Sequence, residues 1–283
     1  MDTAVEWTVF IAMLASASMH ASWNAWVKSR PDPGSAMVAL SLGSGLPYLG
    51  VLLWVGLPAR GAWPFIAGTV VLSTCAALIL TASYRHGDFA VAYPLVRGLI
   101  PVALVLAAVP LFHEVPSLGG VAGVVTIAAG LLLVAWESAQ RSKTMTSVGL
   151  ALAAAAAALN ATSALVDAQG ARLAASPLAY AGTVAVCSSV FMAMTQVRRR
   201  DLFKALRVDW KIAAFGALLS NGSYLLYVWS MARAPVAMVG AVRETSMLFA
   251  LLIGAVVLGE RIGGWRVLAV GLMLGGICLL KLG

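Results

Sequence analysis

Three charged residues lie inside segments of the chain that are otherwise apolar. Arg97 is found in VAYPLVRGLIP, and Arg243 and Glu244 are adjacent in AVRETSM. A charged side chain at membrane depth is costly, so it usually faces a bundle interior or a water-filled cavity. If Glu244 pairs with one arginine, the other keeps its charge, and its planar guanidinium suits a carboxylate, phosphate or phosphonate. The pattern indicates a site for a small anionic or zwitterionic molecule; the alternative is that both arginines bond only helix-end carbonyls or Glu244.

Other polar and aromatic residues recur at helical spacing in comparable segments. His20 and Asn24 are four residues apart and therefore share one helix face, with Trp23 on its flank. Aromatic rings beside a cation suit a zwitterion, whose ammonium group can face the rings or Glu244. The alternative is that these polar residues bond neighbouring helices to one another. The predicted substrate-binding residues are Tyr93, Arg97, Arg243, Glu244, His20, Trp23, Asn24, Asn160, Asn221, Tyr224 and Tyr227.

The elements that position these residues are predicted to be membrane-spanning helices. The chain has 283 residues, of which 61% are hydrophobic and 11% charged, and its mean hydropathy is +0.93. A soluble domain is about 45–50% apolar and about 25% charged. An apolar span of about 20 residues crosses the hydrocarbon core. Applied along the chain, this length predicts an all-α integral membrane protein with ten spans: 5–27, 35–57, 62–83, 89–111, 117–136, 146–167, 176–197, 211–231, 235–258 and 264–282.

The net charge of +8 is interpreted as topogenic rather than as a nucleic-acid footprint. Most of the 19 lysines and arginines lie in connectors that follow odd-numbered spans. Because positively charged connectors stay on the cytoplasmic side, this bias predicts both termini outside the cytoplasm. We expect a multi-pass protein of the cytoplasmic (inner) membrane, and the first segment is interpreted as a retained span rather than a signal peptide.

The two halves of the chain can be laid over one another. RHGDFAVAYPLVRGLIPVALVLAAVPLFHEVPSLGG aligns without a gap on MARAPVAMVGAVRETSMLFALLIGAVVLGERIGGWR, so that Arg97 meets Arg243 and Glu114 meets Glu260. Asn160 likewise corresponds to Asn24. Five spans in each half require the second copy to be inverted, which is a transporter architecture with a site near the midplane. We predict inverted five-helix repeats over 1–140 and 141–283, around a central cavity.

These motifs resemble the drug/metabolite transporter (DMT) superfamily, specifically the ten-span EamA-type permeases, over nearly the whole chain. The resemblance rests on FHEVPSLGGVAGVVTIAAGLLL and LGERIGGWRVLAVGLMLGGICLL, in which an acid ends one helix before a glycine-rich one, and on HASWNAWVK and ALNATSALV. It implies alternating access through a central cavity. It also implies that Glu114 and Glu260 are architectural, as helix caps or loop salt bridges. The superfamily moves amino acids, sugars, nucleotide sugars, phosphorylated metabolites and drugs, so the resemblance names no substrate.

The predicted function is secondary active transport of a small anionic or zwitterionic metabolite such as an amino acid, a phosphonate or a phosphorylated compound. One alternative is an exporter of amphipathic drugs or toxic metabolites; a more distant one is a membrane subunit that does not transport. An enzyme is not predicted, because H-E-x-x-H and G-x-S-x-G are both missing from the sequence.

No P-loop is present, so an ion gradient or a counter-substrate must supply the energy. Glu244 or His20 is the expected proton carrier. We expect no cofactor or metal, no nucleic acid, and as partners only the small-molecule substrate and the lipid bilayer, in a monomer or weak dimer. GLMLG matches G-x-x-x-G, which suits either dimerisation or a closely packed neighbouring helix. Three cysteines, Cys75, Cys187 and Cys278, are expected to be free, buried thiols.

Overall fold

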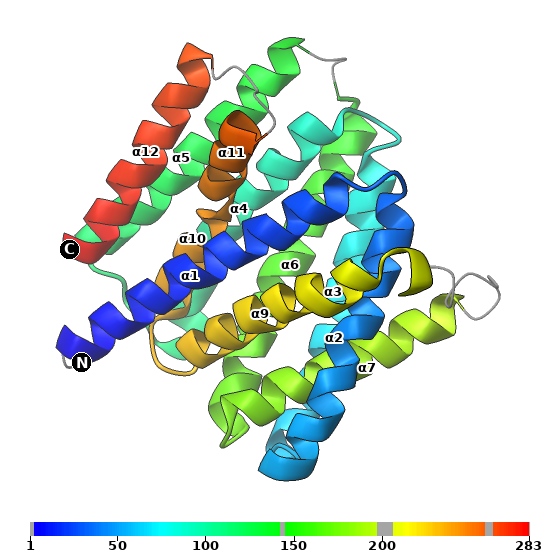
Figure 1. Cartoon of the computed structure of the whole chain (residues 1–283). Helices are drawn as coiled ribbons and strands as arrows, with labels where there is room; N and C mark the ends of the chain where they lie inside the picture. Colours follow the sequence, from blue (N-terminus) through cyan, green and yellow to red (C-terminus); the bar gives the residue numbers. More distant parts are fainter. Residues whose placement is uncertain (1–2, 142–144, 197–205, 258–262, 283) are drawn as a thin grey trace. The chain divides into compact units, whose positions relative to one another are not determined.

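The computed structural model describes residues 3–141, 145–196, 206–257 and 263–282, and this part of the chain contains helices and no strands. The helices are α1 (Thr3–Lys28), α2 (Pro33–Val55), α3 (Trp63–Ser83), α4 (Phe89–Phe112), α5 (Leu118–Arg141), α6 (Ser147–Leu173), α7 (Pro177–Gln196), α9 (Ala217–Met231), α10 (Val236–Glu244), α11 (Ser246–Val257) and α12 (Gly264–Leu282), with a 3₁₀ turn η1 (Arg60–Ala62) and a π-helical turn η2 (Ile212–Gly216) (Figure 1).

Nine helical stretches within the described residues are long and apolar enough to cross a membrane. Together they make the chain a multi-pass membrane protein. The helix α1 is not among the nine, so the predicted number of ten spans is not confirmed, and the inverted repeat stays a prediction. Four predicted segments differ from the helices. The helix α5 extends past 136 to Arg141 and α6 extends past 167 to Leu173, the segment 211–231 opens with the π-helical turn η2, and the segment 235–258 is divided into α10 and α11.

The sequence explains where two of the helices begin. The Oδ1 atom of Asp32 accepts hydrogen bonds from the backbone N–H groups of Gly34 and Ser35, at 3.0 and 3.1 Å, and Pro33 begins α2. The Oδ1 atom of Asp88 accepts from the N–H of Ala90 at 2.9 Å at the start of α4. Aspartate satisfies backbone donors that a helix start leaves unpaired, and proline needs no donor there.

The break between α10 and α11 lies at Thr245, whereas α4 runs unbroken through Pro94 and Pro101. The Thr245 hydroxyl donates to the carbonyl of Val242 at 2.6 Å, and the Thr245 N–H bonds the same carbonyl at 3.2 Å. A threonine hydroxyl that competes for a nearby carbonyl weakens the regular helical pattern. Local hydroxyl bonding, rather than proline, therefore accompanies the interruption.

Contacts divide the chain into two compact units, and the division falls inside α3 and α6. The first unit comprises Met1–Val70 and Asp167–Arg233, and the second comprises Val71–Val166 and Ala234–Gly283. Each unit combines segments of both predicted repeats. Within the units, helices that the repeat prediction pairs pack together: α2 with α7, α4 with α10, and α5 with α12.

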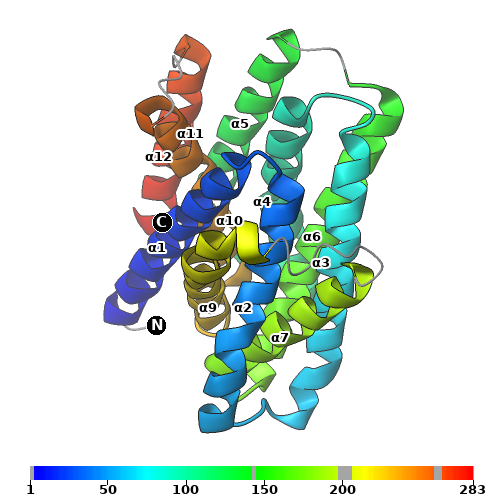
Figure 2. The ribbon, with the colours of Figure 1, turned by 45° about the vertical axis from the view of Figure 1, so that its right-hand side comes forward.

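In the first unit, α1 packs against α9, and α2 packs against α7 and η2 (Figure 2). The Ser16 hydroxyl donates to the carbonyl of Ser223 at 2.7 Å, and the Ser223 hydroxyl donates to the carbonyl of Ser16 at 2.8 Å. A Cβ on Gly43 of α2 would stand 1.9 Å from the carbonyl oxygen of Ala213. Glycine is therefore needed where α2 meets η2.

In the second unit, α5 lies alongside α12 in both views (Figures 1 and 2). A Cβ on Gly276 would stand 2.7 Å from the carbonyl oxygen of Gly123, and one on Gly123 would stand 2.8 Å from that of Gly276. By contrast, Gly271 and Gly275 of the GLMLG motif have no neighbour within 4 Å among the described residues. The neighbouring helix α5 therefore packs against Gly276, just after the motif, and not against the G-x-x-x-G pair.

The cysteine prediction is partly wrong. Cys75 and Cys278 are exposed on the helix surface and Cys187 is half-buried, all with free thiols. The outer surface of a membrane protein is apolar because it meets lipid, so a place within an apolar segment does not imply burial inside the protein.

Candidate functional site

A buried ion pair joins α4 to α10 in the second unit. The Nε atom of Arg97 lies 2.8 Å from Oε2 of Glu244, and the two side chains are 11% and 3% exposed. The Nη2 atom of Arg97 also donates to the hydroxyl of Ser246, the first residue of α11. One guanidinium thus bonds the last residue of α10 and the first of α11.

The break at Thr245 makes this arrangement possible. Residues two positions apart in a regular α-helix do not face each other, since each residue turns the helix by about 100°. Glu244 and Ser246 are two positions apart, yet both contact the Arg97 side chain. The interruption of the helix therefore places two polar groups on one cation.

Glycines fix the position of α4 between its neighbours. A Cβ on Gly98 would stand 3.1 Å from the Leu132 side chain of α5, and a Cβ on Gly240 of α10 would stand 2.2 Å from the Leu104 side chain of α4. Small residues allow helices in a membrane to approach closely. The glycine that follows Arg97 makes room for a helix rather than for a ligand.

A row of aromatic rings extends along α4 from the ion pair. The Cζ atom of Arg97 lies 5.6 Å from the ring centroid of Tyr93, within the range of a cation–π contact. The Tyr93 ring stacks on Phe89 with centroids 5.2 Å apart, and Phe89 meets Tyr84 edge-on at 5.0 Å. Tyr84 lies outside the spanning helices, and burial, together with the nearby Tyr93, raises the pKa of its phenol. That phenol is therefore neutral at physiological pH.

Arg243 adds a second positive charge. It precedes Glu244 on α10, is half-buried, and acts electrostatically on the Glu244 carboxylate. Two guanidiniums therefore lie close to one carboxylate. The structure thus brings together Tyr93, Arg97, Arg243 and Glu244, which are four of the predicted site residues. It also resolves which arginine forms the close ion pair with Glu244, namely Arg97.

Asn160 and Glu114 have local roles in the same unit. The Asn160 side-chain amide donates to the carbonyl of Ala156 on its own helix at 2.8 Å, and no described contact joins it to Arg97. The N–H of Val236 donates to Oε2 of Glu114 at 2.7 Å, at the start of α10. This bond is the capping contact expected of Glu114, while Glu260 lies outside the described residues.

The remaining predicted site residues belong to the first unit. The Nδ2 atom of Asn24 and Nε2 of His20 are 3.1 Å apart, and the His20 ring meets Trp23 edge-on at 4.9 Å, so these residues share one side of α1 as predicted. The buried indole N–H of Trp23 meets no acceptor among the described residues. Asn221 donates to the carbonyl of Ser44 at 3.0 Å, and so bonds α9 to α2. For Asn221, the contact matches the alternative of interhelical bonding.

Tyr224 leads to a residue that the sequence prediction missed. Its hydroxyl donates to Oδ1 of Asp167 at 2.9 Å, and the same oxygen accepts from Tyr180 at 3.0 Å and from Thr69 at 2.7 Å. The Asp167 side chain is buried, and Tyr227 lies beside Tyr224 with ring centroids 6.2 Å apart. We call Asp167, Thr69, Tyr180 and Tyr224 the Asp167 cluster.

Glu244 is therefore not the only acid inside a spanning helix. The prediction ended the sixth span at 167, which made Asp167 its last residue, whereas α6 continues to Leu173. The available signal was the run from Asp167 to Leu173, which contains no proline before Pro177. Alanine, glutamine, arginine and leucine in that run all favour continuation of a helix.

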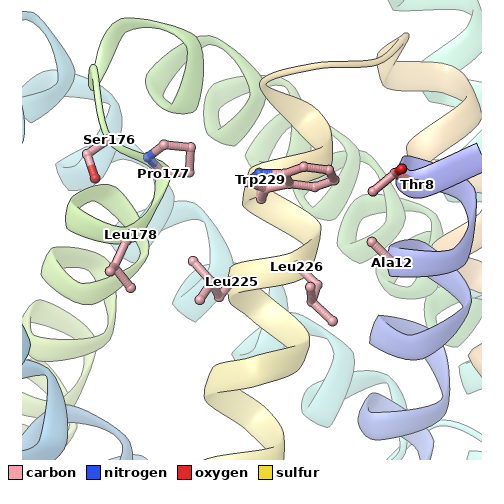
Figure 3. A pocket seen from close by; sticks show the side chains of 8 residues that line it. All are labelled: Thr8, Ala12, Ser176, Pro177, Leu178, Leu225, Leu226 and Trp229. Carbon is pink, nitrogen blue, oxygen red and sulfur yellow. The ribbon is translucent and has the colours of Figure 1, made fainter. Parts of the chain in front are cut away.

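An apolar cavity of about 410 Å³ lies elsewhere in the first unit (Figure 3). Its lining residues are Thr8 and Ala12 of α1, Ser176, Pro177 and Leu178 at the start of α7, and Leu225, Leu226 and Trp229 of α9. The Trp229 indole lies between Pro177 and Thr8 in this view. None of the predicted site residues lines the cavity, and its chemistry suits an aliphatic chain rather than an anion.

Comparison with known proteins bears on the family and on the fold. Residues 147–282 match the sequence model of the EamA-like transporter family. No curated protein matches the sequence. One protein of known crystal structure has a similar fold, with a TM-score of 0.75 over 97% of this chain and 96% of the other, at 17% sequence identity. At this identity the likeness concerns the fold alone.

Proposed function

Because this chain is an EamA-family membrane protein, we propose that it is a secondary transporter for a small anionic or zwitterionic metabolite. The anionic group of the substrate binds in the second unit, at Arg97 and Arg243, next to Glu244. The observation that carries the proposal is the close pairing of Glu244 with Arg97 beside a second arginine.

The arginines support an anion. Arg243 precedes Glu244 on α10, so two guanidiniums lie close to the Glu244 carboxylate. A carboxylate, phosphonate or phosphate accepts two parallel hydrogen bonds from a guanidinium, which gives the site both charge and shape complementarity.

The neighbouring groups suit a zwitterion in particular. The Tyr93 ring already lies within cation–π distance of Arg97, and an ammonium group can contact the same kind of ring face. Glu244 can exchange its bond with Arg97 for one with the ammonium group of a substrate. An amino acid therefore fits both signs of charge, whereas a phosphorylated compound uses only the arginines.

One observation favours a second function, export of amphipathic compounds. The apolar cavity between α1, α7 and α9 offers about 410 Å³ for a hydrocarbon moiety. A compound bound there would contact mainly leucine, proline and tryptophan side chains, so its binding would not depend on Arg243.

We also propose a cytoplasmic-membrane location with both termini outside the cytoplasm. The distribution of lysine and arginine among the connectors supports this orientation.

A thermal-melting screen of the full-length protein in detergent tests the substrate class. The probes are glutamate, methylphosphonate, glycerol 3-phosphate and the lipophilic cation tetraphenylphosphonium. We expect at least one of the first three to raise the melting temperature of the wild type, because a ligand that binds only the folded state stabilises it. Stabilisation by the cation alone overturns the proposal.

The matched variants are Arg243→Gln and Arg233→Gln, which remove the same charge. Arg233 is exposed and lies over the Trp229 ring in the first unit. Arg243→Gln is expected to abolish both the stabilisation and uptake of the same radiolabelled probe into proteoliposomes, while Arg233→Gln leaves both unchanged. Uptake at the wild-type rate by Arg243→Gln contradicts the role of Arg243.

A further inference from the structure

We propose that the adjoining ends of α5 and α12 bind the phosphate headgroup of an anionic phospholipid from the surrounding bilayer. The site lies within the second unit, where α5 packs against α12 (Figure 1). Its residues are Trp136, Glu137 and Arg141 of α5, and Trp265 and Arg266 of α12. The inference goes beyond the proposed transport function and does not depend on it.

One buried carboxylate holds two arginines side by side. The Nη2 atom of Arg141 lies 2.7 Å from Oε1 of Glu137, and the Nε atom of Arg266 lies 2.9 Å from Oε2 of the same residue. The Glu137 side chain is 3% exposed, whereas that of Arg141 is 61% exposed. A Cβ on Gly263 would stand 3.0 Å from Nη2 of Arg141, so this arginine also lies next to the start of α12. The two guanidiniums are therefore fixed close together, and Arg141 is open to the surroundings.

This arrangement suits a phosphate that approaches from outside the protein. A guanidinium carries five N–H donors, and the closest contacts with Glu137 involve one nitrogen of each arginine. A phosphate accepts two parallel hydrogen bonds from a guanidinium, which the exposed Arg141 can supply. Because Glu137 already immobilises both arginine side chains, less conformational entropy is lost when the phosphate binds. The ion pairs thus prepare the site as well as joining α5 to α12.

Two exposed tryptophans mark the depth of the site in the membrane. Trp136 is in the last two turns of α5 and Trp265 is in the first turn of α12. Their rings meet edge-on with centroids 5.1 Å apart, and the two residues are 46% and 51% exposed. Tryptophan is enriched where the hydrocarbon meets the headgroups. The pair is therefore placed to contact the glycerol and the first acyl carbons of a lipid whose phosphate binds the arginines.

The arginines select an anionic lipid over a zwitterionic one. Phosphatidylcholine brings its own cation beside the phosphate, and that cation is repelled by the guanidiniums, whereas phosphatidylglycerol brings the phosphate without a cation. One basic residue near the membrane surface favours an anionic lipid by about fivefold. The proposed orientation also places this end of α5 and α12 on the cytoplasmic side, where anionic lipids give the leaflet a negative surface potential.

Quenching of tryptophan fluorescence by brominated lipids tests the site in the full-length protein. Two kinds of vesicle contain the same mixture of phosphatidylcholine and phosphatidylglycerol and the same amount of bromine, and they differ only in which lipid carries the bromine near its headgroup. We expect stronger quenching when phosphatidylglycerol carries it. The excess should reach at most two ninths of the emission, because two of the nine tryptophans lie at the site. Equal quenching in the two kinds of vesicle overturns the inference.

Arg141→Gln should reduce the excess quenching, because it weakens the preference for phosphatidylglycerol by about fivefold. The matched control is Arg85→Gln, which removes the same charge from an exposed position in the connector between α3 and α4 of the second unit. This control should keep the excess. An equal loss in both variants contradicts a local site, because the charge would then act on the bilayer as a whole.

Trp136→Phe combined with Trp265→Phe tests the location and keeps both arginines. This variant should lose the excess quenching, because the two reporters at the site are gone. If the excess remains, the lipid binds near other tryptophans and the inference is wrong. The anion screen uses no vesicles and these measurements use no substrate, so the lipid site and the proposed function fail independently.

Discussion

Neutralising Glu244 tests whether the Arg97–Glu244 pair stabilises the second unit. The Nε and Oε2 atoms are 2.8 Å apart, and both side chains are shielded from solvent. Charges about 4 Å apart attract by about 4 kcal/mol at an effective dielectric constant of about 20. Removing one partner of a buried pair typically costs about 3–5 kcal/mol. In the unfolded, membrane-embedded state a charged side chain can find other hydrogen-bonding partners, which reduces the cost of losing the pair. We therefore expect Glu244→Gln to lower the free energy of unfolding by about 2–3 kcal/mol.

The assay is a double-mutant cycle with Arg97→Gln. The unfolding of each variant in mixed micelles is monitored by the circular dichroism of its helices. The double variant should recover part of the loss, because neither member of the pair is then left without the other, and the coupling energy should be about 1–2 kcal/mol. Arg141→Gln serves as the control. Its Nη2 atom lies 2.7 Å from Oε1 of Glu137, close to the 2.8 Å of the Arg97–Glu244 pair. Because the Arg141 side chain is 61% exposed, the loss should stay below about 1 kcal/mol. Additive effects of the two single variants refute the reasoning.

Two further predictions concern packing and topology. Gly43→Ala should lower the melting temperature strongly, because its Cβ would stand 1.9 Å from the Ala213 carbonyl oxygen. Gly50→Ala in the same helix should be neutral or stabilising, because a Cβ there would have no neighbour within 4 Å among the described residues. Equal melting temperatures of the two variants would contradict the close contact of α2 and η2. For topology, alkaline phosphatase fused to the C-terminus should be active and green fluorescent protein fused there should be dark. Fluorescence at that end would instead place the C-terminus in the cytoplasm.

The sequence predicts which side chains of the candidate site are neighbours where the residues lie close together along the chain. His20, Trp23 and Asn24 share one side of α1 because spacing within one helix determines which side chains are neighbours. The stacking of Arg97 near Tyr93 follows from the same rule. Asn160 and Asn221 show its limit: both bond backbone carbonyls, and polarity alone does not distinguish a ligand-binding amide from a structural one.

Asp167 shows why the rest of the site could not be predicted. Its donors Thr69, Tyr180 and Tyr224 come from three other helices, and no local pattern indicates that they meet. The error in the end of the sixth span also concealed the acid, because boundaries read from hydropathy depend on where polar residues begin. In α6 a polar residue lies within the helix instead.

The sequence by itself determined the membrane class of the protein, the approximate positions of its helices and the presence of charged residues inside apolar segments. These properties depend on composition and on the length of apolar runs, which are local along the chain. Only the tertiary structure decided that Glu244 pairs closely with Arg97, and that Thr245 interrupts the helix between Glu244 and Ser246, which both contact the Arg97 guanidinium. It also decided that three hydroxyls converge on Asp167. The physical reason is that close packing, at glycines such as Gly98 and Gly240, sets the rotation and separation of helices distant in sequence.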